Sequence, residues 1–555
     1  MLMKKTLAVF LAVAISVPFL SACAQKENGK AAEGTPSAQT ASQSAADGGN
    51  SLPIVNKPIT IKALGAAKAD TVSVAKTFSE VACFKELEKL TGIKIEWQHP
   101  PVGQEEQVVN LAVASGDMPD FIWGGINTDL LSKLANNGSI VNLKDYLDKF
   151  DSNFMKVLNK YDQAKKQALN DDGSIYAFPM MRIKEFEDGS QGWFSIYGPM
   201  IRKDWLDNLG LKEPETIDEL HTVLKAFKEK DANKNGDPND EIPFIAQKNL
   251  DFLSSAWGFF DSSADGYSYV DNGKVNLSFL SPACRDYVAT MHQWYEEGLL
   301  DKDYLTTDNK AFEAMITSDK AGFYYTYNAF IVNFYNTAKD KIPGFAIKAL
   351  PWSTGPAGKS YSGSRDDIAM VFSGGTVVSS KSRYIDEIVR MLDYVYSDEG
   401  TRLFNYGIEN ESYVMENGKP KYTDIVMKNP DGLTINQALC KYSMAVGNFS
   451  MTKDPDYFEQ ITFVIPPQRE SHEIWSQADK SLFYPQRASF TTEETNKMTK
   501  LQNDINTYWN EIFSKMVVGV EPVENFDKHV EALKKMGADE LIQIRQAAYD
   551  RYMNR

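Results

Sequence analysis

The sequence predicts an α/β protein, and the order of three segments in its first hundred residues carries that prediction. Residues 59–64 and 93–97 alternate apolar and polar side chains, as strands do. Between them, residues 78–90 repeat apolar side chains at helical spacing, and Gly92 follows as a helix stop. The order strand, helix, strand is typical of two parallel strands joined by a crossover helix.

The alternation of helices and short strands continues along the rest of the body. Residues 104–114 have helical spacing and precede an apolar strand at 121–123, and a last segment, about 504–553, is strongly helical. Thr216 and Glu219 have the spacing of a capping box at the start of a further helix. Since no linker rich in Pro or Ser interrupts the body and no repeat of 20–50 residues occurs, we expect one α/β body.

The N-terminus has the pattern of an exported lipoprotein. Lys4 and Lys5 precede an apolar run over residues 7–20, which is shorter than the about 20 apolar residues that span a bilayer. This order is typical of a secretory signal, here residues 1–22. The run ends in Leu-Ser-Ala-Cys, which resembles a lipobox, in which Cys23 is acylated with fatty acids such as palmitate and becomes the first residue of the mature chain. An ordinary secretory signal with an incidental cysteine is the alternative.

The residues after Cys23 predict a tether. Residues 24 to about 51 consist mainly of Ala, Gly, Ser, Gln, Thr and Asn, which cannot bury a core. We expect residues 23–56 to be a flexible link between a lipid and the folded body. The lipid would hold the protein on the extracytoplasmic face of the cell membrane.

The composition excludes several classes of protein. A chain of 555 residues with 43% hydrophobic side chains can bury a large core in two or three domains. A net charge of −16 makes nucleic acid and anionic lipid poor partners. Beyond Cys23, the widely spaced Cys83, Cys284 and Cys440 fit neither a disulfide framework nor a zinc motif, so we expect buried single thiols in a monomer.

The sharpest local motif is an oxygen-rich loop after the helix that begins near Thr216. Asp231, Asn233 and Asn235 stand at positions 1, 3 and 5, with Gly236 at position 6, as in the first half of a calcium loop. Alternate residues of such a tight loop direct hard oxygen atoms inward, and glycine permits the sharp turn.

The second half of this loop differs from an EF-hand. Position 12 is Ile242 instead of glutamate, and Pro243 prevents an exiting helix. We expect Asp240 and Glu241 to supply the late carboxylates of a structural Ca²⁺ site. A solvated turn without metal is the alternative.

Aromatic side chains beside glycines and turns form a second set of candidates. Flat rings stack on the C–H faces of sugars, while Asp, Asn, Arg and Gln bond their hydroxyls. Ordinary core packing is the alternative for each ring. The candidate ligand-binding residues are Trp123, Trp193, Tyr197, Trp257, Tyr325, Tyr327, Trp352, Arg365 and Trp475.

Catalytic motifs are not evident in the sequence. None of the five histidines stands in a metal or triad motif, and no GxSxG, HExxH or Walker-type loop occurs. No carboxylate pair is distinguished as an acid/base couple. We expect a binding protein and no enzyme, with a surface glycoside hydrolase or lyase, or a binder of a non-sugar ligand such as a peptide, as the alternatives.

Several segments together carry a resemblance to a known family. They are residues 84–93 (FKELEKLTGI), 114–120 (ASGDMPD), 172–179 (DGSIYAFP), 202–210 (RKDWLDNLG), 214–220 (PETIDEL), 396–400 (YSDEG) and 405–409 (NYGIE), together with the loop that ends in Glu-Ile-Pro. From about residue 57 onward the chain resembles the extracellular solute-binding proteins of carbohydrate ABC importers, in the lipoprotein branch that includes the alginate-binding proteins.

The resemblance implies an architecture of two lobes. The fold would be a periplasmic-binding-protein-like fold of type II, with α/β lobes joined by a hinge and the ligand cleft between them. Residues 57–178 and about 345–400 would form the N-terminal lobe, and residues 179–344 and about 401–555 the C-terminal lobe. Binding would close the lobes by a hinge motion.

The resemblance also implies a function and a metal site. The protein would capture a carbohydrate, most simply an oligosaccharide, and deliver it to the permease subunits of an ABC transporter. A structural calcium ion would be held by the loop through Asp231, Asn233, Asn235, Asp240, Glu241 and a backbone carbonyl near Asp237.

Overall fold

The computed structural model describes residues 51–186, 189, 191–248, 250–263, 266–365, 370–372 and 375–555. The predicted signal peptide, the lipidation residue Cys23 and the predicted tether up to residue 50 lie outside these residues. The chain divides into two units, and everything from Gly48 onward belongs to one of them.

No helix in these described ranges is long and apolar enough to cross a membrane.

The first lobe is built on a four-stranded sheet in the order β13-β3-β1-β2. Its strands are β1 (Ile59–Gly65), β2 (Ile93–Gln98), β3 (Phe121–Trp123) and β13 (Thr376–Val378). Strand β1 lies parallel to β2 and β3, whereas β13 is antiparallel to β3. The parallel pairing confirms the predicted strand, helix, strand unit, with α2 (Ala82–Thr91) as its crossover helix.

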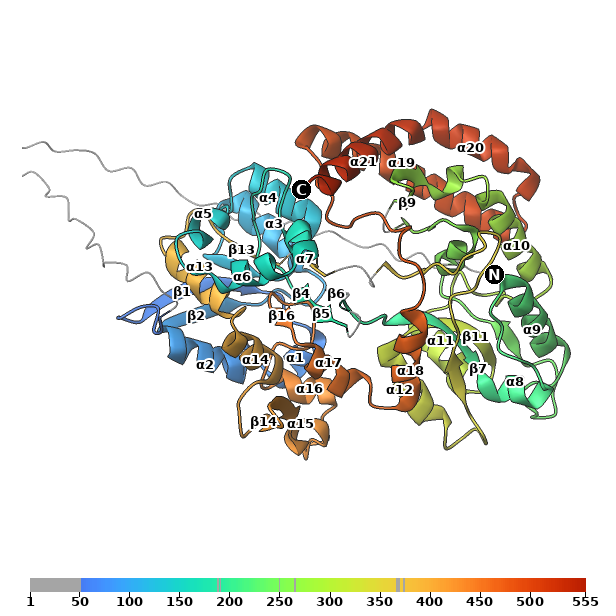
Figure 1. The fold of residues 1–555 in the computed structure, drawn as a ribbon, viewed down its shortest axis with the longest axis horizontal. Coiled ribbons are helices and arrows are strands. Elements are labelled where there is room, and N and C mark those ends of the chain that lie inside the picture. The colour runs from blue at the N-terminus through green and yellow to red at the C-terminus, as the bar shows by residue number, and fades with distance from the viewer. Residues whose placement is uncertain are drawn as a thin grey trace, which may run out of the picture. The chain divides into compact units, whose positions relative to one another are not determined.

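Apolar side chains cover both faces of this first sheet. Ile61 and Phe121 pack into the larger core of the lobe, while Ile122 and Val377 pack into a smaller one on the other face. Burial on both faces is usual for largely parallel sheets. The helices of this part are α1 (Ala69–Val74), α2, α3 (Glu105–Ser115), α4 (Thr128–Asn136), α5 (Lys144–Leu147), α6 (Asn153–Lys160), α7 (Asp162–Ala168), α13 (Ile385–Tyr394) and α14 (Asp398–Tyr406). Although far away in sequence, α13 packs beside α5 and α6 (Figure 1).

A small subdomain follows α14 and has its own apolar cluster. Its buried members include Tyr406, Tyr422 and Leu439. Its elements are β14 (Tyr413–Glu416), β15 (Lys419–Tyr422), α15 (Asp424–Met427), α16 (Ile435–Cys440) and α17 (Pro455–Thr462). Helix α16 packs on α1, which attaches the subdomain to the first lobe.

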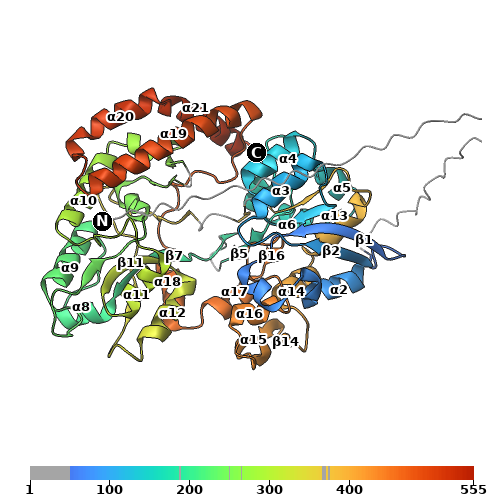
Figure 2. The ribbon, with the colours of Figure 1, turned by 180° about the vertical axis from the view of Figure 1, so that it is seen from behind.

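The second lobe is built on a mixed sheet in the order β12-β7-β11-β8. Its strands are β7 (Tyr197–Arg202), β8 (Ile242–Phe244), β11 (Ala321–Tyr327) and β12 (Ile347–Ala349), and β9 (Ser268–Asp271) and β10 (Lys274–Leu277) form a separate hairpin. Its helices are α8 (Lys203–Leu209), α9 (Ile217–Glu229), α10 (Cys284–Glu296), α11 (Asn309–Thr317), α12 (Asn328–Ala338), α18 (Pro466–Trp475), α19 (Thr492–Val517), α20 (Phe526–Lys535) and α21 (Ala538–Met553). Figure 2 shows α19 and α21, in red, beside each other, and α19 packs on α10.

Several further sequence predictions are confirmed at the level of single elements. The capping box of Thr216 and Glu219 is present at the start of α9. The helical segment near the C-terminus is divided into α19, α20 and α21, and it begins at Thr492, earlier than the pattern indicated. Cys83, Cys284 and Cys440 are free and buried.

The two lobes differ from the predicted boundaries at two places. Residues 345–352 belong to the second core, because β12 pairs with β7 and Trp352 packs there. Residues 401–451 belong to the first lobe, because Phe404 stacks on Trp123 with ring centroids 5.8 Å apart. The chain therefore passes between the cores three times in its described part, namely between Ile183 and Tyr197, between Tyr361 and Met370 and between Met451 and Ile465.

Short strands lie along the passages between the cores. They are β4 (Met181–Arg182), β5 (Lys184–Glu185), β6 (Gln191–Gly192) and β16 (Thr452–Lys453). Strand β16 pairs in parallel with β4, and β5 pairs with β6. The third passage is thus hydrogen-bonded to the segment directly before the first passage.

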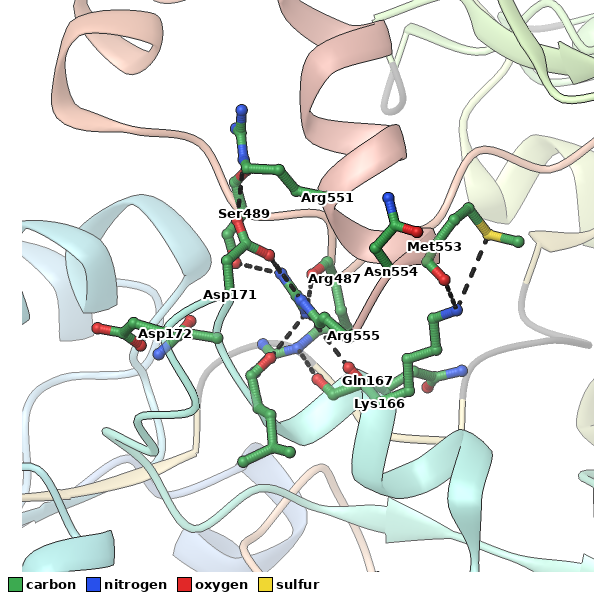
Figure 3. A network of polar contacts seen from close by, with 12 residues as sticks. Lys166, Gln167, Asp171, Asp172, Arg487, Ser489, Arg551, Met553, Asn554 and Arg555 are labelled. Atoms are coloured by element: carbon green, nitrogen blue, oxygen red, sulfur yellow. Dashed lines mark hydrogen bonds and ion pairs between the residues drawn. The ribbon is translucent and has the colours of Figure 1, made fainter.

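A polar network joins α21 to the segment after α7, and we call it the arginine clasp (Figure 3). Arg555 donates to Asp171 at 2.7 Å, to the Leu169 carbonyl at 2.7 Å and to the Arg487 carbonyl at 2.9 Å. Arg551 donates to the other oxygen of Asp171 at 3.0 Å. The Arg555 side chain is only 4% exposed and Asp171 is 26% exposed, so the clasp is a largely buried contact between residues of the two lobes.

Candidate functional site

The carboxyl edge of the second sheet is the place where the candidate site begins. Strands β8 and β11 are parallel and end at Phe244 and Tyr327. Strand β7 is antiparallel to β11, so its first residue, Tyr197, lies opposite Tyr327. Pro243 is tolerated in β8 because that strand is at the edge of the sheet. Ligands of open α/β sheets usually bind outside this edge.

A cavity of about 540 Å³ opens at this edge, within the usual size range of ligand sites. Two helices contribute side chains to it at helical spacing. Helix α11 presents positions 309, 312 and 313, and α12 presents positions 330, 333 and 334. The lining residues are Tyr197, Phe244, Ile245, Ala246, Gln247, Leu250, Phe252, Asn309, Phe312, Glu313, Tyr325, Thr326, Tyr327, Phe330, Asn333 and Phe334.

Aromatic rings form one continuous surface in this cavity. Tyr197 contacts Phe252 and Tyr327, with ring centroids 4.4 and 4.6 Å apart. Tyr325 lies 5.5 Å from Phe252. Tyr327 and Phe330 remain 42% and 49% exposed, so both side chains keep accessible surface in this cavity.

Hydrogen-bonding groups surround these rings. Gln247 donates to Asn309 at 2.9 Å, which holds two amides side by side. Burial raises the pKa of the Tyr325 phenol, and burial together with the nearby Asp251 carboxylate raises the pKa of Tyr197. Both phenols therefore stay protonated at neutral pH and can donate hydrogen bonds. The arrangement suits a ligand that combines apolar faces with many hydroxyl groups.

Two buried carboxylates lie behind the cavity. Burial and the neighbouring Asp261 raise the pKa of Asp251 to about 7, and burial raises the pKa of Asp261 to about 6. Trp509 donates to Asp261 at 3.2 Å, whereas one oxygen of Asp251 is buried without a partner. This pair costs stability when it is ionised.

Helix α12, which carries part of the lining, is fixed to α18 by a buried polar pairing. The amide of Asn328 donates to the Gln468 carbonyl and, at 2.6 Å, to the Ser471 hydroxyl. The Gln468 amide donates back to the Asn328 carbonyl at 3.1 Å. All three side chains are buried. Since α18 follows directly on a passage between the cores, the lining is connected to that passage.

Three of the predicted ligand residues meet in the cavity, and two tryptophans support it from behind. Tyr197, Tyr325 and Tyr327 line the cavity. Trp352 is 1% exposed and packs against Tyr325 at 5.5 Å. Trp475 is buried under β7 and donates to the Pro199 carbonyl at 3.2 Å.

The other predicted ligand residues lie elsewhere. Trp123 is buried in the first core, and Trp257 is 5% exposed against Tyr287. Trp193 is 2% exposed and lines a second cavity of about 450 Å³ beside the passages. Arg365 stands on the passage that follows Trp352 and is not among the described lining residues of either cavity. The candidate site therefore consists of the tyrosines and the residues around them.

Sequence reasoning missed the phenylalanines and amides of the lining. It selected Trp and Tyr beside glycines, whereas Phe330, Asn333 and Phe334 stand on a helix. Spacings of three and four residues place Asn309, Phe312 and Glu313 together in the same way. The sequence pattern that could have predicted these residues is a helix face that mixes aromatic and amide side chains next to a strand end. The buried face of a helix is usually purely apolar.

The predicted metal loop joins α9 to β8, and its side chains turn inward. Asp231 accepts from the backbone N–H groups of Asn235 and Gly236, both at 3.0 Å. Asn233 also accepts from Asn235 N–H, at 3.0 Å, and Asn235 accepts from Asp237 N–H at 2.7 Å. Gly236 adopts the left-handed region with φ 94°, as the tight turn requires.

Glu241 provides the test of whether this loop fits a cation. One of its oxygens accepts from Ala232 N–H at 2.8 Å, and the other is buried without a partner. The amide nitrogens of Asn233 and Asn235 contact Asp240 at 3.3 and 3.0 Å, and rotation of each amide would place its oxygen there instead. The donor set is therefore hard oxygen, which fits Ca²⁺. Among the described residues, no three Asp, Glu, His or Cys side chains already meet as a metal cluster.

Comparisons with known proteins all indicate the same family. The family model for bacterial extracellular solute-binding proteins matches residues 68–402. The fructooligosaccharide ABC transporter substrate-binding protein FusA of Streptococcus pneumoniae is 28% identical over 85% of this chain and 87% of its own. The polygalacturonan/rhamnogalacturonan-binding protein YtcQ and the lipoprotein LipO, both of Bacillus subtilis, are 24% and 25% identical over 84% and 83% of this chain and 87% of each relative.

Solved structures show the same two-lobed fold. The alginate-binding protein AlgQ2, in a crystal structure without calcium ion, has a TM-score of 0.70 at 28% identity, over 90% of this chain and 99% of its own. FusA in complex with kestose has a TM-score of 0.70 at 25% identity, over 89% and 100% of the two chains. An EF-hand mutant of FusA is a further neighbour, with a TM-score of 0.69 at 25% identity over the same shares. With 335 of its residues matched by the family model, the chain belongs to the bacterial extracellular solute-binding proteins.

Proposed function

We propose that this protein captures an oligosaccharide outside the cell and delivers it to the permease of an ABC importer. The observation that carries the proposal is the cavity in which exposed aromatic rings stand among amides and phenols. Ring faces of this kind stack on the C–H surfaces of sugars, and the amides match sugar hydroxyls. FusA, YtcQ and AlgQ2 are carbohydrate-binding proteins by name, which supports the same ligand class here.

The test is a binding screen on the chain without residues 1–23. Oligosaccharides and peptides of matched length are added, and the thermal midpoint and the heat of binding are measured. An oligosaccharide that raises the midpoint and is recovered unchanged supports the proposal. Peptide binding without sugar binding would overturn it, and conversion of the sugar to products would favour the hydrolase or lyase alternative.

Ligand would act on this protein by favouring one arrangement of the two lobes. Sugar held between the lobes stabilises the closed form in proportion to its differential affinity for it. The second lobe would supply the wall of the cleft that carries the aromatic rings. A monomer would contain both walls of the cleft. Small-angle scattering with and without sugar is the measurement, and a ligand that leaves the radius of gyration unchanged would contradict hinge closure.

A lipid on Cys23 would keep this receptor near its transporter. The lipobox motif is the basis of this proposal, and the relative LipO carries the name of a lipoprotein. One acyl chain binds membranes only marginally, so two or more chains are expected. The change Cys23→Ser should release the protein into the medium, and the labelling of cells with a palmitate analogue should no longer mark it.

The loop from Asp231 to Glu241 would hold a structural Ca²⁺ ion. The inward side-chain oxygens and the unpartnered Glu241 oxygen support this proposal. Ca²⁺ would neutralise the carboxylates that meet there and so stabilise the loop between α9 and β8. Added Ca²⁺ should raise the thermal midpoint of the wild type and not that of Asp231→Ala, while chelator should lower it only in the wild type.

A further inference from the structure

The charges around the sugar cavity carry an inference about the ligand, one that rests on the proposed function. Among its described lining residues there is no Lys, Arg or His, and Glu313 is the one acidic side chain. We infer that the captured oligosaccharide is uncharged and that a sugar acid, such as a uronate, is rejected.

The charged residues around the cavity also favour an uncharged ligand over an acidic one. Asp251 lies beside two lining residues and influences the titration of Tyr197. Asp308 caps α11 at the edge of the cavity by accepting from Ala311 N–H at 2.8 Å. Two lysines adjoin lining residues in sequence. Lys248 follows Gln247 and lines the small adjacent cavity together with Asp251, and Lys310 follows Asn309 on α11 but is not among the described lining residues. A ligand in the main cavity therefore has carboxylates around it and no cation among its described lining residues.

Desolvation turns this charge distribution into selectivity. A uronate that enters an apolar cavity loses its hydration, and proteins compensate for such a loss with Arg or Lys. Here the compensation is absent from the described lining, and Glu313 adds repulsion. A neutral sugar loses only the hydration of its hydroxyls, which Gln247, Asn309 and Asn333 can replace.

The corresponding edge of the first sheet does not place positive charge at its strand ends. Strands β1 and β3 end beside Ala66, Gly124 and Gly125, which are small and uncharged. Lys68 comes next along the chain, with its stem against Gly447. It is the residue to examine if an acidic ligand is bound after all.

The experiment compares neutral and acidic oligosaccharides of equal length on the chain without residues 1–23. The probes are fructose-based and glucose-based trisaccharides, trigalacturonate and its methyl ester, and affinity is measured by calorimetry at 20 and 300 mM salt. We expect a neutral sugar to bind at least tenfold more tightly than trigalacturonate, with affinity independent of salt. If trigalacturonate binds best, or if binding weakens steeply with salt, the inference is overturned while carbohydrate capture stands. If no sugar binds, both fail.

A charge-reversal variant tests the cause of the selectivity. The change Glu313→Lys should raise the ratio of acidic to neutral affinity at least tenfold. Glu531→Lys makes the same change in net charge at an exposed position of α20 and should leave the ratio as it is. Equal ratios in the two variants would show that net charge alone discriminates and would overturn the role of the cavity. A folded Glu313→Lys protein is verified by its far-UV circular dichroism.

Discussion

At the scale of single residues, exposure separates the ligand candidates from the core. The sequence predicts a role for each aromatic residue from its neighbours, but cannot indicate whether its ring ends under a sheet or at its edge. Trp123 and Trp475 are fully buried, because a large ring is most stable when its whole surface leaves water. Tyr327 keeps 42% of its surface exposed at the end of a strand. This distinction depends on long-range packing, which no local pattern contains.

The exposed ring of Tyr327 is expected to carry binding energy. The change Tyr327→Ala should weaken sugar binding about five- to tenfold, because it removes a stacking surface worth about 1 kcal/mol. Tyr327→Phe retains the ring and should stay within about twofold of the wild type. Calorimetry with the best ligand measures both, and an alanine variant of unchanged affinity would move the site away from this cavity.

Asp251 is expected to make stability depend on pH. Its pKa in the folded state is about 7, above the ordinary value of 3.8, so the folded protein binds the proton more tightly than the unfolded chain does. Stability is then greatest below pH 4 to 5, as far as this group is concerned, and falls as pH rises towards 7. Asp251→Asn should remove this slope and gain on the order of 2 kcal/mol at pH 8.

The control for this change is an exposed carboxylate of the same lobe. Asp504→Asn alters the net charge equally, and its position on α19 is exposed. Thermal midpoints are measured from pH 4 to 8 for both variants and the wild type. Parallel curves for Asp251→Asn and Asp504→Asn would show that burial of Asp251 has no energetic consequence.

At the scale of elements, local signals predicted helices and strands well. The capping box at Thr216, the stop at Gly92 and the alternation of β1 and β2 are encoded within a few residues. Strand β12 has only three residues, too few for a sequence pattern to predict it, and its place is decided by pairing with β7. Elements whose stability is local can thus be predicted, and elements held by distant partners cannot.

The first of these local signals allows a direct test. Thr216→Ala should destabilise the protein by about 1 kcal/mol, because the N-terminal N–H groups of α9 lose their cap. Thr222→Ala on the same helix removes only a hydroxyl that donates to the Asp218 carbonyl and should cost less. Urea unfolding measures both, and equal midpoints would show that the cap is replaced by water.

The contact between β7 and α18 depends on a missing side chain. A Cβ atom at Gly198 would lie 2.5 Å from the Trp475 ring, so Gly198→Ala must displace either the strand or the tryptophan. We expect a lower thermal midpoint and weaker sugar binding, because Tyr197 is the next residue. The double variant with Trp475→Leu should be less destabilised than the sum of the single variants. Strict additivity would show that the two residues do not press on each other.

At the scale of the whole molecule, the sequence predicted two lobes but not where each passage begins. The shared core of Trp123 and Phe404 assigns residues after 401 to the first lobe, a contact across almost 300 residues. Resemblance to a family predicts the two-lobed architecture, because members of a family share the packing of their cores. It does not convey boundaries, since these shift with insertions.

The arginine clasp is expected to contribute to the stability of the assembled lobes. Arg555→Gln should cost about 1 to 3 kcal/mol, because Asp171 and several carbonyls lose a buried charged donor. Arg285→Gln breaks an ion pair with Asp527 in which both side chains are largely exposed, and should cost at most about 1 kcal/mol. Denaturant midpoints decide between them, and equal losses would mean that the clasp is no stronger than a surface pair.

The pairing of α12 with α18 has a consequence for how this protein can diverge. In a buried position, the Asn328 amide donates to the Ser471 hydroxyl, and the Gln468 side chain donates to the Asn328 backbone carbonyl. A change at Asn328 or at Gln468 therefore removes a hydrogen bond between the two helices. Among relatives, positions 328 and 471, whose side chains bond each other, should be replaced together, and position 468 should keep a side chain that donates a hydrogen bond. One helical turn further on, Phe330 and Asn333 face the cavity and have no such obligation. Lineages that take up different sugars are therefore expected to differ at 330 and 333 on a conserved attachment.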